Sequence, residues 1–463
     1  MHCGYVTTLN NVRKHPNADK LVLATCFVNT VCINKDMYHE GEIGVYFPVD
    51  LQLSMEFCQK NGLLAVYENG INVSGGYMDP AKRNVKAIKL RGEQSDGLFL
   101  PLKCLEYTGV DMDSLNIGDT ITTVNGHEIC RKYIPRGKHH ATAAGGAGKR
   151  AKRKAKRSIA PVFYEHIDTE QLAYNLHMFK SGDLIEITRK LHGTSARTSH
   201  TKVLKGFKRN LLDIILRREG TPIYDWGTVS GTRRTVLDTF DGGFYGSNEF
   251  RKPYHDFFEG KLLKGETVYY EIVGFTHDGG SIMGVCDNKK LKDKEFVKKY
   301  GEKTIFSYGC APFPEKLVLS EIAENCHPAK PQSDIYVYRM TMTNEDGEVV
   351  EYTPDQMRHR CMYMGVKTVP VHWYGFIPEN PGSHDDPTIS AGEWVLKKAE
   401  QFYDGEEPID PTHIREGVVV RVINRPTFTA YKHKNFAFKV IEGIIKEVAE
   451  APDMEEADGL DEE

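Results

Sequence analysis

The sequence predicts an α+β protein in which a domain of antiparallel sheets with flanking helices follows a small all-β barrel. Two observations lead to this fold class. Short β-rich segments separated by turn residues fill residues 1–135, whereas β-rich and helical segments share residues 160–445. A chain of 463 residues is also too long for a single core, so two or three domains are expected.

Residues 1–135 contain short, partly alternating runs of apolar and β-branched residues, which are typical of strands in a small barrel. Ahead of the first run stands the heptapeptide HPNADKL (15–21), which fits a turn between two strands. The segments predicted as strands are KLVLATCFV (20–28), EIGVYFPVD (42–50), NVKAIKLRG (84–92), DGLFLPL (96–102) and GDTITTV (118–124).

Two charged segments of opposite sign flank the second domain. The predicted linker (136–159) contains GKRAKRKAKR, with seven Lys/Arg in ten residues, and the predicted disordered tail (446–463) ends in a stretch with eight acidic residues. They nearly cancel in the net charge of −4. GGAGKR in the linker is not a phosphate-binding loop, because Ala143 and Arg150 stand where a glycine and a Ser/Thr are needed. We interpret the linker as a disordered basic hinge, whose charge could add salt-sensitive affinity for phosphates or serve as a nuclear import signal.

Composition narrows the class of protein. No apolar run approaches the roughly 18 residues that span a bilayer, and the N-terminus lacks the apolar centre of a signal peptide. The ten cysteines include no C-x-x-C pair, which argues against a zinc site. We therefore expect an intracellular protein, cytoplasmic or nuclear, with reduced thiols, no membrane partner and a monomeric state.

The second domain (160–445) mixes strand and helix patterns. The predicted strands are DLIEITRKL (183–191), TVYYEIVGF (267–275), DIYVYRMTMT (334–343), EGVVVRVI (416–423) and FAFKVI (436–441). The predicted helices are EFRKPYHDFFEGKLLK (249–264), PDQMRHRCMYMG (354–365) and GEWVLKKAEQFYDG (392–405). No repeat of 20–50 residues is visible.

Five polar fragments follow one another along this domain, and their order is the main functional signal. RKLHGTSAR (189–197) places Lys190 at a strand end, three residues before a glycine that permits close approach of a ligand. Each fragment alone has an ordinary explanation, since most strand lysines are solvated and many strand carboxylates are paired. Five in this order are hard to reach by chance. The other four are SGTRRTV (230–236), YYEIVGF (269–275), REGVVVR (415–421) and KHKNFAFKVI (432–441).

In this order the fragments resemble the collinear motifs of the covalent nucleotidyltransferase superfamily of ATP-dependent ligases and capping enzymes. EHIDTEQL (165–172) before KLHGTSAR, with HKNFAFKV at the end, is more closely similar to the Deinococcus-type RNA ligase family. The resemblance implies an N-terminal OB-fold module and an adenylyltransferase domain of the ATP-grasp-like ligase type. HPNADKL also resembles the start of OB modules that bind tRNA, so nucleic-acid contact by residues 1–135 is expected.

The resemblance implies a three-step reaction. A lysine amine attacks the α-phosphate of ATP and releases pyrophosphate, AMP passes to an RNA 5′-phosphate, and a 3′-hydroxyl displaces AMP and seals the strand. Lys190 is the implied nucleophile, and an amine attacks only in its neutral form, which a nearby cation or metal favours. Such chemistry needs positioning and charge neutralisation rather than a Ser–His–Asp arrangement.

The same resemblance assigns roles to further residues. Glu416 is the expected carboxylate for Mg²⁺ or Mn²⁺, and Glu271 would hold the ribose hydroxyls or a metal-bound water. Lys434 and Lys439 would neutralise the α-phosphate, with Lys432 ranked below them. The other expected contacts to ATP are His166, Asp168, Gln171, Arg197 and Arg233, with Val418 beneath the adenine and either Phe306 or Tyr338 above it. An equally good reading of residues 166–171 is a helix start capped by Asp168.

Two residues depart from the superfamily pattern. His192 stands where many members have an aspartate, although the closer family shows K-L-H-G. Tyr270 stands where a glycine often precedes the strand glutamate, which leaves the backbone at Glu271 uncertain.

The main hypothesis is an ATP-dependent RNA ligase that acts in RNA repair, and two alternatives remain. A DNA ligase or a capping nucleotidyltransferase usually has an OB domain after the last lysine strand, whereas only 24 residues follow Lys439. An RNA-binding protein with an inactive ligase domain is disfavoured by the presence of Lys190, Glu271, Glu416 and Lys439. The RNA substrate, whether a nicked duplex, a tRNA half or single-stranded ends, stays open.

Overall fold

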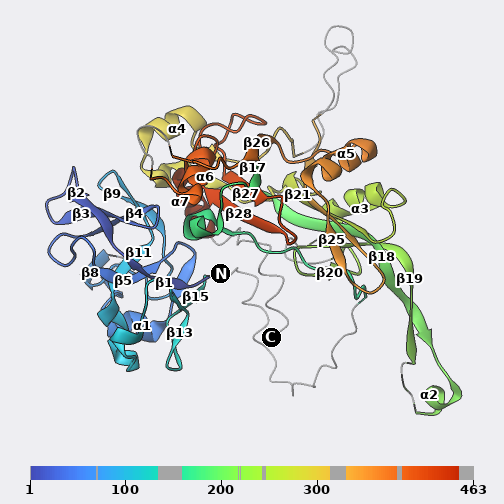
Figure 1. Ribbon diagram of the computed structural model, residues 1–463, viewed down its shortest axis with the longest axis horizontal. Helices are drawn as coiled ribbons and strands as arrows, with labels where there is room; N and C mark the ends of the chain where they lie inside the picture. Colours follow the sequence, from blue (N-terminus) through green and yellow to red (C-terminus); the bar gives the residue numbers. More distant parts are fainter. Residues whose placement is uncertain are drawn as a thin grey trace, which may run out of the picture. The chain divides into compact units, whose positions relative to one another are not determined.

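The computed structural model of the protein describes residues 2–68, 71–133, 159–216, 218, 220–241, 247–312, 330–382 and 388–447 (Figure 1). The predicted linker and tail lie almost wholly outside these ranges. Of the described residues, those up to 133, Gln171–Asn175 and Asn435–Glu447 form unit 1, and the others form unit 2. Within the described ranges, no helix is long and apolar enough to cross a membrane.

Unit 1 consists of short antiparallel strands. The five strand predictions in this region are confirmed, but the described strands form several small sheets and not one closed barrel. One sheet has the order β11–β5–β1–β12, another β2–β3–β4, and the rest pair as β9–β10, β6–β15, β7–β8 and β13–β14. The strands are β1 (Gly4–Thr8), β2 (Asn10–Lys14), β3 (Leu21–Cys26), β4 (Asn29–Asn34), β5 (Ile43–Phe47), β6 (Leu51–Leu53), β7 (Ala65–Glu68), β8 (Ile71–Gly75), β9 (Ala87–Leu90), β10 (Glu93–Asp96), β11 (Leu98–Pro101), β12 (Thr120–Ile121), β13 (Thr123–Val124), β14 (His127–Glu128) and β15 (Cys130–Lys132).

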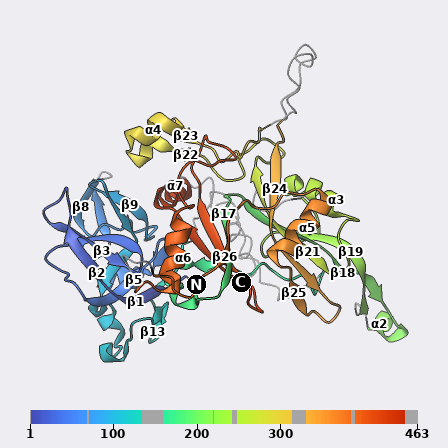
Figure 2. The ribbon, with the colours of Figure 1, turned by 45° about the horizontal axis from the view of Figure 1, so that its top comes forward.

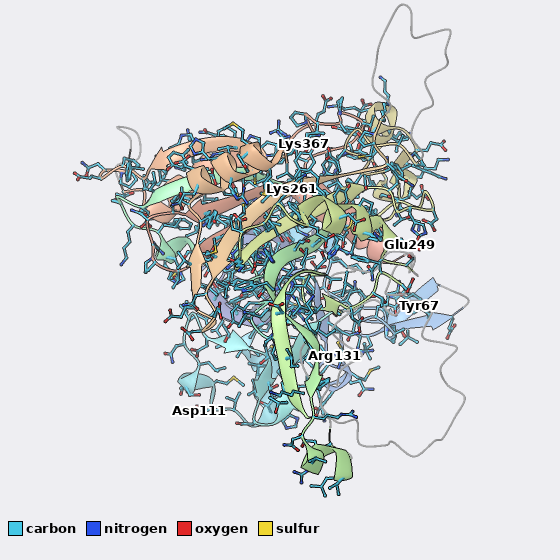
Figure 3. All side chains as sticks on the ribbon, turned by 90° about the vertical axis from the view of Figure 1, so that its right-hand side faces the viewer. Tyr67, Asp111, Arg131, Glu249, Lys261 and Lys367 are labelled. Atoms are coloured by element: carbon cyan, nitrogen blue, oxygen red, sulfur yellow. The ribbon has the colours of Figure 1, made fainter. Side chains whose placement is uncertain are left out.

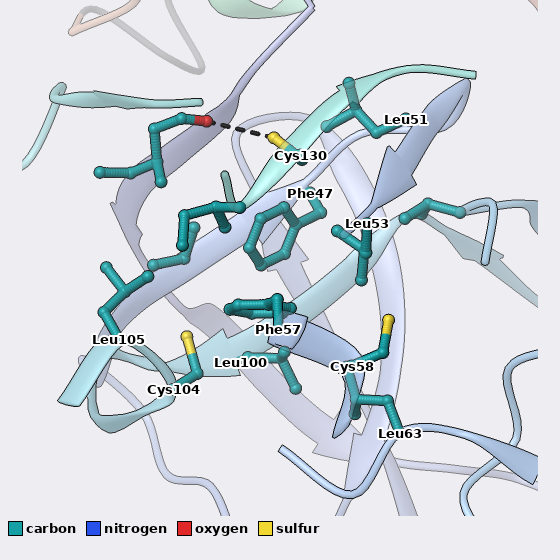
Figure 4. Packing of buried hydrophobic residues seen from close by; sticks show 14 of the residues in the cluster. Phe47, Leu51, Leu53, Phe57, Cys58, Leu63, Leu100, Cys104, Leu105 and Cys130 are labelled. Atoms are coloured by element: carbon teal, nitrogen blue, oxygen red, sulfur yellow. Dashed lines mark hydrogen bonds between the residues drawn. The ribbon is translucent and has the colours of Figure 1, made fainter. Parts of the chain in front are cut away.

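The larger core of unit 1 packs α1 (Met55–Lys60) against β5, β6 and β11 (Figure 4). Ser54 caps this helix by accepting a hydrogen bond from the N–H of Phe57. The rings of Phe47 and Phe57 meet at 5.4 Å between centroids, and both are fully buried. Burial of each such ring stabilises the fold by about 1.5–3 kcal/mol, so this cluster holds the small sheets together.

The heptapeptide HPNADKL forms the turn between β2 and β3, as predicted. His15 is fully buried, its Nε2 lies 3.1 Å from the carbonyl oxygen of Leu90, and its Nδ1 accepts a hydrogen bond from the N–H of Asn17. Asn17 Nδ2 donates to the carbonyl of Arg91 at 2.9 Å. The side chains of His15 and Asn17 therefore fix this turn to the β9–β10 turn.

The segment FAFKVI is helical, and the strand prediction for it was wrong. It begins α7 (Phe436–Glu447), where the side chain of Asn435 accepts a hydrogen bond from the N–H of Phe438 at 2.7 Å. Phe438, Ile441 and Ile445 follow at helical spacing and are buried. The structure packs this helix in unit 1, whereas the sequence analysis assigned residues 435–445 to the second domain.

Unit 2 contains two antiparallel sheets that hold the motifs. We call the first the motif sheet; in it the strands β28, β27, β17 and β26 lie side by side in that order. The second has six strands in the order β20–β19–β18–β21–β24–β25. The strands are β17 (Leu184–Lys190), β18 (Thr194–Lys208), β19 (Thr221–Gly231), β20 (Val236–Leu237), β21 (Glu266–Gly274), β24 (Ser333–Thr343), β25 (Val349–Glu351), β26 (Val371–Phe376), β27 (Gly417–Val422) and β28 (Thr429–Lys434), with β22 (Cys286–Asp287) pairing with β23 (Lys303–Thr304) outside both sheets.

Helices cover the six-stranded sheet, and the three helix predictions are confirmed. α3 (Lys252–Phe258) and α5 (Pro354–Met364) lie beside β21 and β24 (Figure 2), where Phe258, Val268 and Met357 share one buried cluster. α5 starts with a Thr353 capping box and ends at a glycine in the left-handed conformation. α6 (Ala391–Glu400) and α4 (Lys294–Tyr300) complete the longer helices of unit 2.

Two strands extend well beyond their sheet. β18 pairs with β21 only over Thr194–Ser199, and its remaining residues pair with β19 alone. The resulting two-stranded ribbon projects from unit 2 and has the short helix α2 (Leu211–Ile215) at its end (Figures 1 and 3). We call residues 200–229 the arm.

Candidate functional site

Strand register brings three of the predicted motifs into one place. On the motif sheet, Lys190 lies opposite Gly417, which in turn lies opposite Lys434. Two residues along each strand, Thr188 lies opposite Val419, and Val419 opposite Lys432. Because side chains alternate between the faces of a strand, these two rows share one face of the sheet.

A pocket opens on that face, between the motif sheet and the six-stranded sheet, and all of its lining residues belong to unit 2. The six-stranded sheet contributes Ser195, Glu271 and Tyr338. The motif sheet contributes Glu186, Thr188, Arg189, Lys190, Val419, Arg421, Ala430 and Lys432, and the remaining lining comes from His166, Thr169, Leu191, Arg233, Met357, Arg358, Val369 and Phe428.

Lys190 and Lys434 share one buried carboxylate. The Nζ atoms of Lys190 and Lys434 lie 3.0 and 3.2 Å from Oε1 of Glu416, whose side chain is 1% exposed. His192 Nδ1 lies 3.8 Å from the other carboxylate oxygen. A buried carboxylate needs such compensation, and here the compensating ammonium groups are themselves held at fixed positions beside the pocket.

The turn after Lys190 carries the chain from the motif sheet to the six-stranded sheet. The N–H of His192 donates to the Tyr308 hydroxyl at 2.8 Å, and the N–H of Gly193 donates to Oε1 of Glu271 at 3.0 Å. A Cβ atom on Gly193 would lie 2.3 Å from the carbonyl oxygen of Ile272, so only glycine permits this approach. The glycine predicted for close contact thus packs against a strand and orients Glu271.

The aromatic residues of the pocket are Tyr338 on β24, Phe428 just before β28, and His166. The hydroxyls of Ser195 and Tyr338 are 2.6 Å apart. The His166 ring lies 5.0 Å from that of Tyr338 and 5.9 Å from that of Phe428, between centroids. Phe306 is instead buried, with its ring against His192 at 4.7 Å. Of the two predicted aromatics, Tyr338 is therefore the one that lines the pocket.

Cations and carboxylates surround the far end of the pocket. Arg358 pairs with the buried Glu186, and Arg339 pairs with Glu351 and lies 3.4 Å from Nδ1 of His166. Burial raises the pKa of Glu186 despite Arg358. Burial, followed by the charges of Arg339 and other guanidinium groups, holds the pKa of His166 well below its usual value, so this ring is neutral at physiological pH.

The two predicted arginines have different environments. Arg233 lines the pocket, and its Nη2 lies 2.6 Å from Asp168, which places the 166–168 segment at the pocket as well. Arg197 is 1% exposed and donates to the carbonyls of Phe163, Thr232 and Arg234 at 3.0–3.2 Å. Each guanidinium nitrogen of Arg197 thus donates to a backbone oxygen, so Arg197 anchors the loop that carries Arg233, and it is not among the residues that line the pocket.

Three further predicted residues lie outside the lining of this pocket. The side chain of Val418 is fully buried and does not line the pocket, because it points to the opposite face from its neighbour Val419. Gln171, at the end of β16 (Glu170–Gln171), is part of unit 1, where its carbonyl accepts a hydrogen bond from Asn175. Lys439 lies on α7, also in unit 1, and its Nζ is 2.5 Å from Asp96.

The rear face of the motif sheet holds a buried ion pair and stacked rings. Arg189 Nη1 donates to the buried Glu407 at 2.7 Å. His433 stacks on Tyr403 at 4.8 Å, and His372 stacks on Phe402 at 5.3 Å. Burial lowers the pKa of His372 to about 4, with further contributions from Arg189 and Arg415. These residues were not singled out from the sequence, since their neighbours Lys190, Lys432 and Lys434 carry the motif.

Tyr270 shows how the chain accommodates a bulky residue before Glu271. The pairing of β21 with β24 shifts register between Tyr269 and Tyr270. The Tyr270 side chain is buried beneath the helices, with its hydroxyl 3.0 Å from Oγ1 of Thr198. Glu271 consequently points the other way, into the pocket.

The carboxylates Glu271 and Glu416 are chemically suited to a hard divalent cation. Mg²⁺ and Mn²⁺ prefer oxygen ligands and accept one or two carboxylates together with waters and phosphate oxygens. Among the described residues, one other grouping of potential ligands, His255, Asp256 and Glu259, lies on the surface around α3. Nothing in its surroundings points to an ion.

Comparison with solved structures identifies the fold. An RNA ligase of Naegleria gruberi, solved as a variant with AMP and Mn, aligns with a TM-score of 0.53 and 15% identity over 95% of this chain and 98% of that chain. Another variant with ATP and Mn gives 0.53, and the ligase with PPi gives 0.52, at the same identity and coverage. The chain therefore shares the fold of this RNA ligase. No protein-family model and no curated protein matches the sequence.

Proposed function

We propose that this protein is an ATP-dependent RNA ligase that joins 3′-hydroxyl and 5′-phosphate ends through a lysyl-AMP intermediate. The observation that carries the proposal is the arrangement around Glu416, where Lys190 and Lys434 contact one buried carboxylate beside an open pocket. The Naegleria structures support it, because the similarity extends over 95% of this chain and those ligases were solved with AMP, ATP and Mn.

The nucleophile in this proposal is Lys190. Its neutral Nζ attacks the α-phosphorus of ATP, an N–P bond forms, the nitrogen loses a proton, and the bond from the α-phosphorus to the bridging oxygen breaks, so that pyrophosphate leaves with the electron pair. An oxygen of the RNA 5′-phosphate then attacks the same phosphorus, the N–P bond breaks, and the nitrogen takes up a proton to restore the amine. The 3′-hydroxyl finally attacks the phosphorus of the RNA 5′-phosphate, loses its proton and expels AMP.

The surrounding side chains supply positioning and charge. Lys432 and Lys434 face the pocket side of the motif sheet and are suited to neutralise charge on the α-phosphate. Tyr338, Phe428 and His166 form the aromatic part of the lining, where a purine would stack. Arg233 is the pocket arginine that would contact phosphate or ribose.

A divalent cation fits the oxygen donors of this site. Glu416 and Glu271 would hold Mg²⁺ or Mn²⁺, which supplies additional positive charge to the phosphate oxygens. Glu271 is held in place by the N–H of Gly193, so its carboxylate is oriented before any ligand arrives.

Finer assignments follow the sequence resemblance. We propose that unit 1 includes an OB-like module that contacts nucleic acid, that the ligase is of the Deinococcus type, and that it acts in RNA repair. The structure supports the first point only through the β-rich composition of unit 1 and its fixed HPNADKL turn.

The direct test is incubation with α-labelled ATP and Mg²⁺, followed by a denaturing gel. The proposal predicts a covalent AMP label on the wild-type protein and none on Lys190→Ala or Lys190→Arg. Lys190→Arg is the matched control, because it retains a cation beside Glu416 but lacks the nucleophilic amine. Labelling of either variant would contradict the proposal.

Two further outcomes separate the alternatives. Label from GTP and none from ATP would indicate capping chemistry. Absence of label from both nucleotides, together with retained RNA binding, would indicate a ligase fold that serves only to bind RNA.

A further inference from the structure

The arm belongs to unit 2 but contributes no residue to the lining of the nucleotide pocket. From residue 200 to 208 β18 is paired only with β19, so nine residues extend beyond the sheet, a reach of roughly 30 Å at the rise of a strand. An isolated two-stranded ribbon is marginally stable in water, and one that extends this far needs support at its base or a partner along its length.

The base of the arm is well supported. Trp226 lies opposite Lys202, and the ammonium groups of Lys202 and Lys264 lie 4.7 and 5.4 Å from its ring centroid. The ring of His200 meets that of Trp226 edge-on at 5.7 Å. Val203 packs against the small cluster of Phe163 and Val229. These contacts hold the first part of the ribbon to unit 2.

The tip of the arm differs sharply from its base. Leu211 is 79% exposed and Ile215 is 72% exposed, and Leu216, Phe207 and Ile223 are also exposed large apolar residues. Several such residues gathered at the end of a projecting ribbon mark an interaction surface, because water contact with them is unfavourable in the free protein.

Exposed cations accompany these apolar residues. Lys205, Lys208, Arg209 and Arg218 are all exposed on the distal part of the arm. The acidic residues described there are Asp213 and Asp225, and Asp213 accepts a hydrogen bond from the N–H of Asn210. The distal arm is therefore cationic, in contrast to the net charge of −4 for the whole chain.

We propose that the arm is a contact surface for the RNA substrate, with its cations on backbone phosphates and its aliphatic tip against the bases or the sugar edge of a groove. This inference rests on the proposed ligase function, since it concerns the polynucleotide that the nucleotide pocket would act on. A polyanion is the partner that exposed lysine and arginine fit. Aliphatic wedges flanked by cations are also a known means of gripping a duplex.

The arm would act outside the first chemical step. It places affinity for RNA away from Lys190, so that self-adenylation depends on the pocket whereas engagement of broken ends depends on the arm as well. Positioning of the ends then uses binding energy that is remote from the reacting phosphorus.

The experiment compares two triple variants of the full chain. The arm variant carries Lys205→Glu, Lys208→Glu and Arg218→Glu, and the control carries Lys290→Glu, Lys294→Glu and Lys298→Glu, which are equally exposed cations around α4. Both change the net charge by the same amount. Affinity for a nicked RNA duplex is measured by fluorescence anisotropy over a range of salt concentrations, beside AMP labelling of each protein.

We expect the arm variant to bind the nicked duplex at least about tenfold more weakly and to lose about 1 from the log–log salt slope per phosphate contact removed. AMP labelling should stay at the wild-type level, and the α4 control should bind RNA like the wild type. A second variant, Leu211→Ser with Ile215→Ser, should weaken RNA binding without changing the salt slope.

Several results would overturn the proposal. Unchanged affinity and slope in the arm variant would do so, as would an equal loss in the α4 control, which would reveal only a net-charge effect. Binding of wild-type protein to phosphatidylserine vesicles, lost in Leu211→Ser/Ile215→Ser while RNA binding persists, would assign the tip to a membrane surface. Failure of the ligase hypothesis is separate, because it would appear as missing AMP label in the wild type while the RNA-binding comparison still stands.

Discussion

The two faces of the motif sheet carry alternate residues of the same strands, yet they differ in how their charges are used. On the pocket face, Lys190 and Lys434 contact Glu416 beside a cavity. On the rear face, Arg189 and Glu407 form a closed pair whose side chains are 7% and 0% exposed. One residue along the chain thus separates a cation available to a ligand from a cation committed to the fold.

The difference teaches that the partner of a charged residue matters more than its presence in a motif. Arg197 belongs to the motif that contains Lys190, but its guanidinium donates hydrogen bonds to three backbone carbonyls. Lys439 belongs to the last motif, but it pairs with Asp96 in unit 1. The pocket face is expected to control activity, and the rear face is expected to control stability.

The largest loss of stability should come from a substitution on the rear face. Arg189→Ala leaves Glu407 buried without its cation, which should lower the free energy of unfolding by about 3–5 kcal/mol. Chemical denaturation measures this loss. The double variant Arg189→Met with Glu407→Leu removes both charges and should recover most of the stability. A single variant as stable as the wild type would contradict the assignment of this pair to the fold.

A substitution on the pocket face should lower activity and leave stability almost unchanged. Lys432→Ala should slow AMP labelling by about 10²-fold, the typical cost of removing one group that stabilises developing charge, with little change in stability. Lys439→Ala is the matched comparison and should lower stability by about 1–3 kcal/mol, because it leaves the buried Asp96 without its cation, while labelling continues. If Lys439→Ala were the variant that lost labelling, the original assignment of Lys439 would be restored.

A substitution in the turn between the two sheets should lower both stability and AMP labelling. Gly193→Ala introduces a Cβ atom against the carbonyl of Ile272, which should cost about 1–3 kcal/mol of stability and displace Glu271, so that AMP labelling falls as well. Gly443→Ala in α7 meets no atom within 4 Å and should stabilise the helix by up to about 1 kcal/mol. Equal behaviour of the two variants would mean that the close approach at Gly193 is relieved without consequence.

The rear face should also give the stability of the protein a pH dependence. His372 has a pKa of about 4 in the folded protein, below the ordinary value of about 6.5. Between these values the unfolded chain binds more protons, so the contribution of this group to stability is present above pH 6.5 and is lost as the pH falls toward 4. His372→Phe keeps an aromatic ring beside Phe402 and should flatten the stability profile in this window. An unchanged slope would contradict the burial of this imidazole.

Much of the fold could be predicted from the sequence, because strand and helix patterns in both units are strongly periodic. The failure at FAFKVI has a clear cause. Asn435 accepts a hydrogen bond at the start of α7, and Phe438, Ile441 and Ile445 follow at helical spacing, but the preceding lysine strand suggested that β structure continued. An asparagine ahead of a helical apolar pattern was the signal that could have corrected the prediction.

The site was harder to predict in detail, since it depends on register. Lys190, Glu271 and Glu416 were singled out from their motifs, and the structure brings them together. The choice of Val419 over Val418 depends on which face of the strand each residue occupies, whereas the choice of Lys432 over Lys439 depends on where the strand gives way to α7. Because side chains two residues apart on a strand share a face, Lys432 would have been placed on the same face as Lys434. The sequence alone does not show where the strand ends, however.

The most direct measurement is to locate the adenylyl group by mass spectrometry. The wild-type protein is incubated with ATP and Mg²⁺, digested and searched for a peptide that carries one AMP, with Lys190→Arg treated in parallel. A single adduct on Lys190, absent from the variant, is the result that we predict. An adduct on Lys432 or Lys434, or the absence of an adduct with both Mg²⁺ and Mn²⁺, would contradict the claim that the lysine beside Glu416 at the end of β17 is the nucleophile.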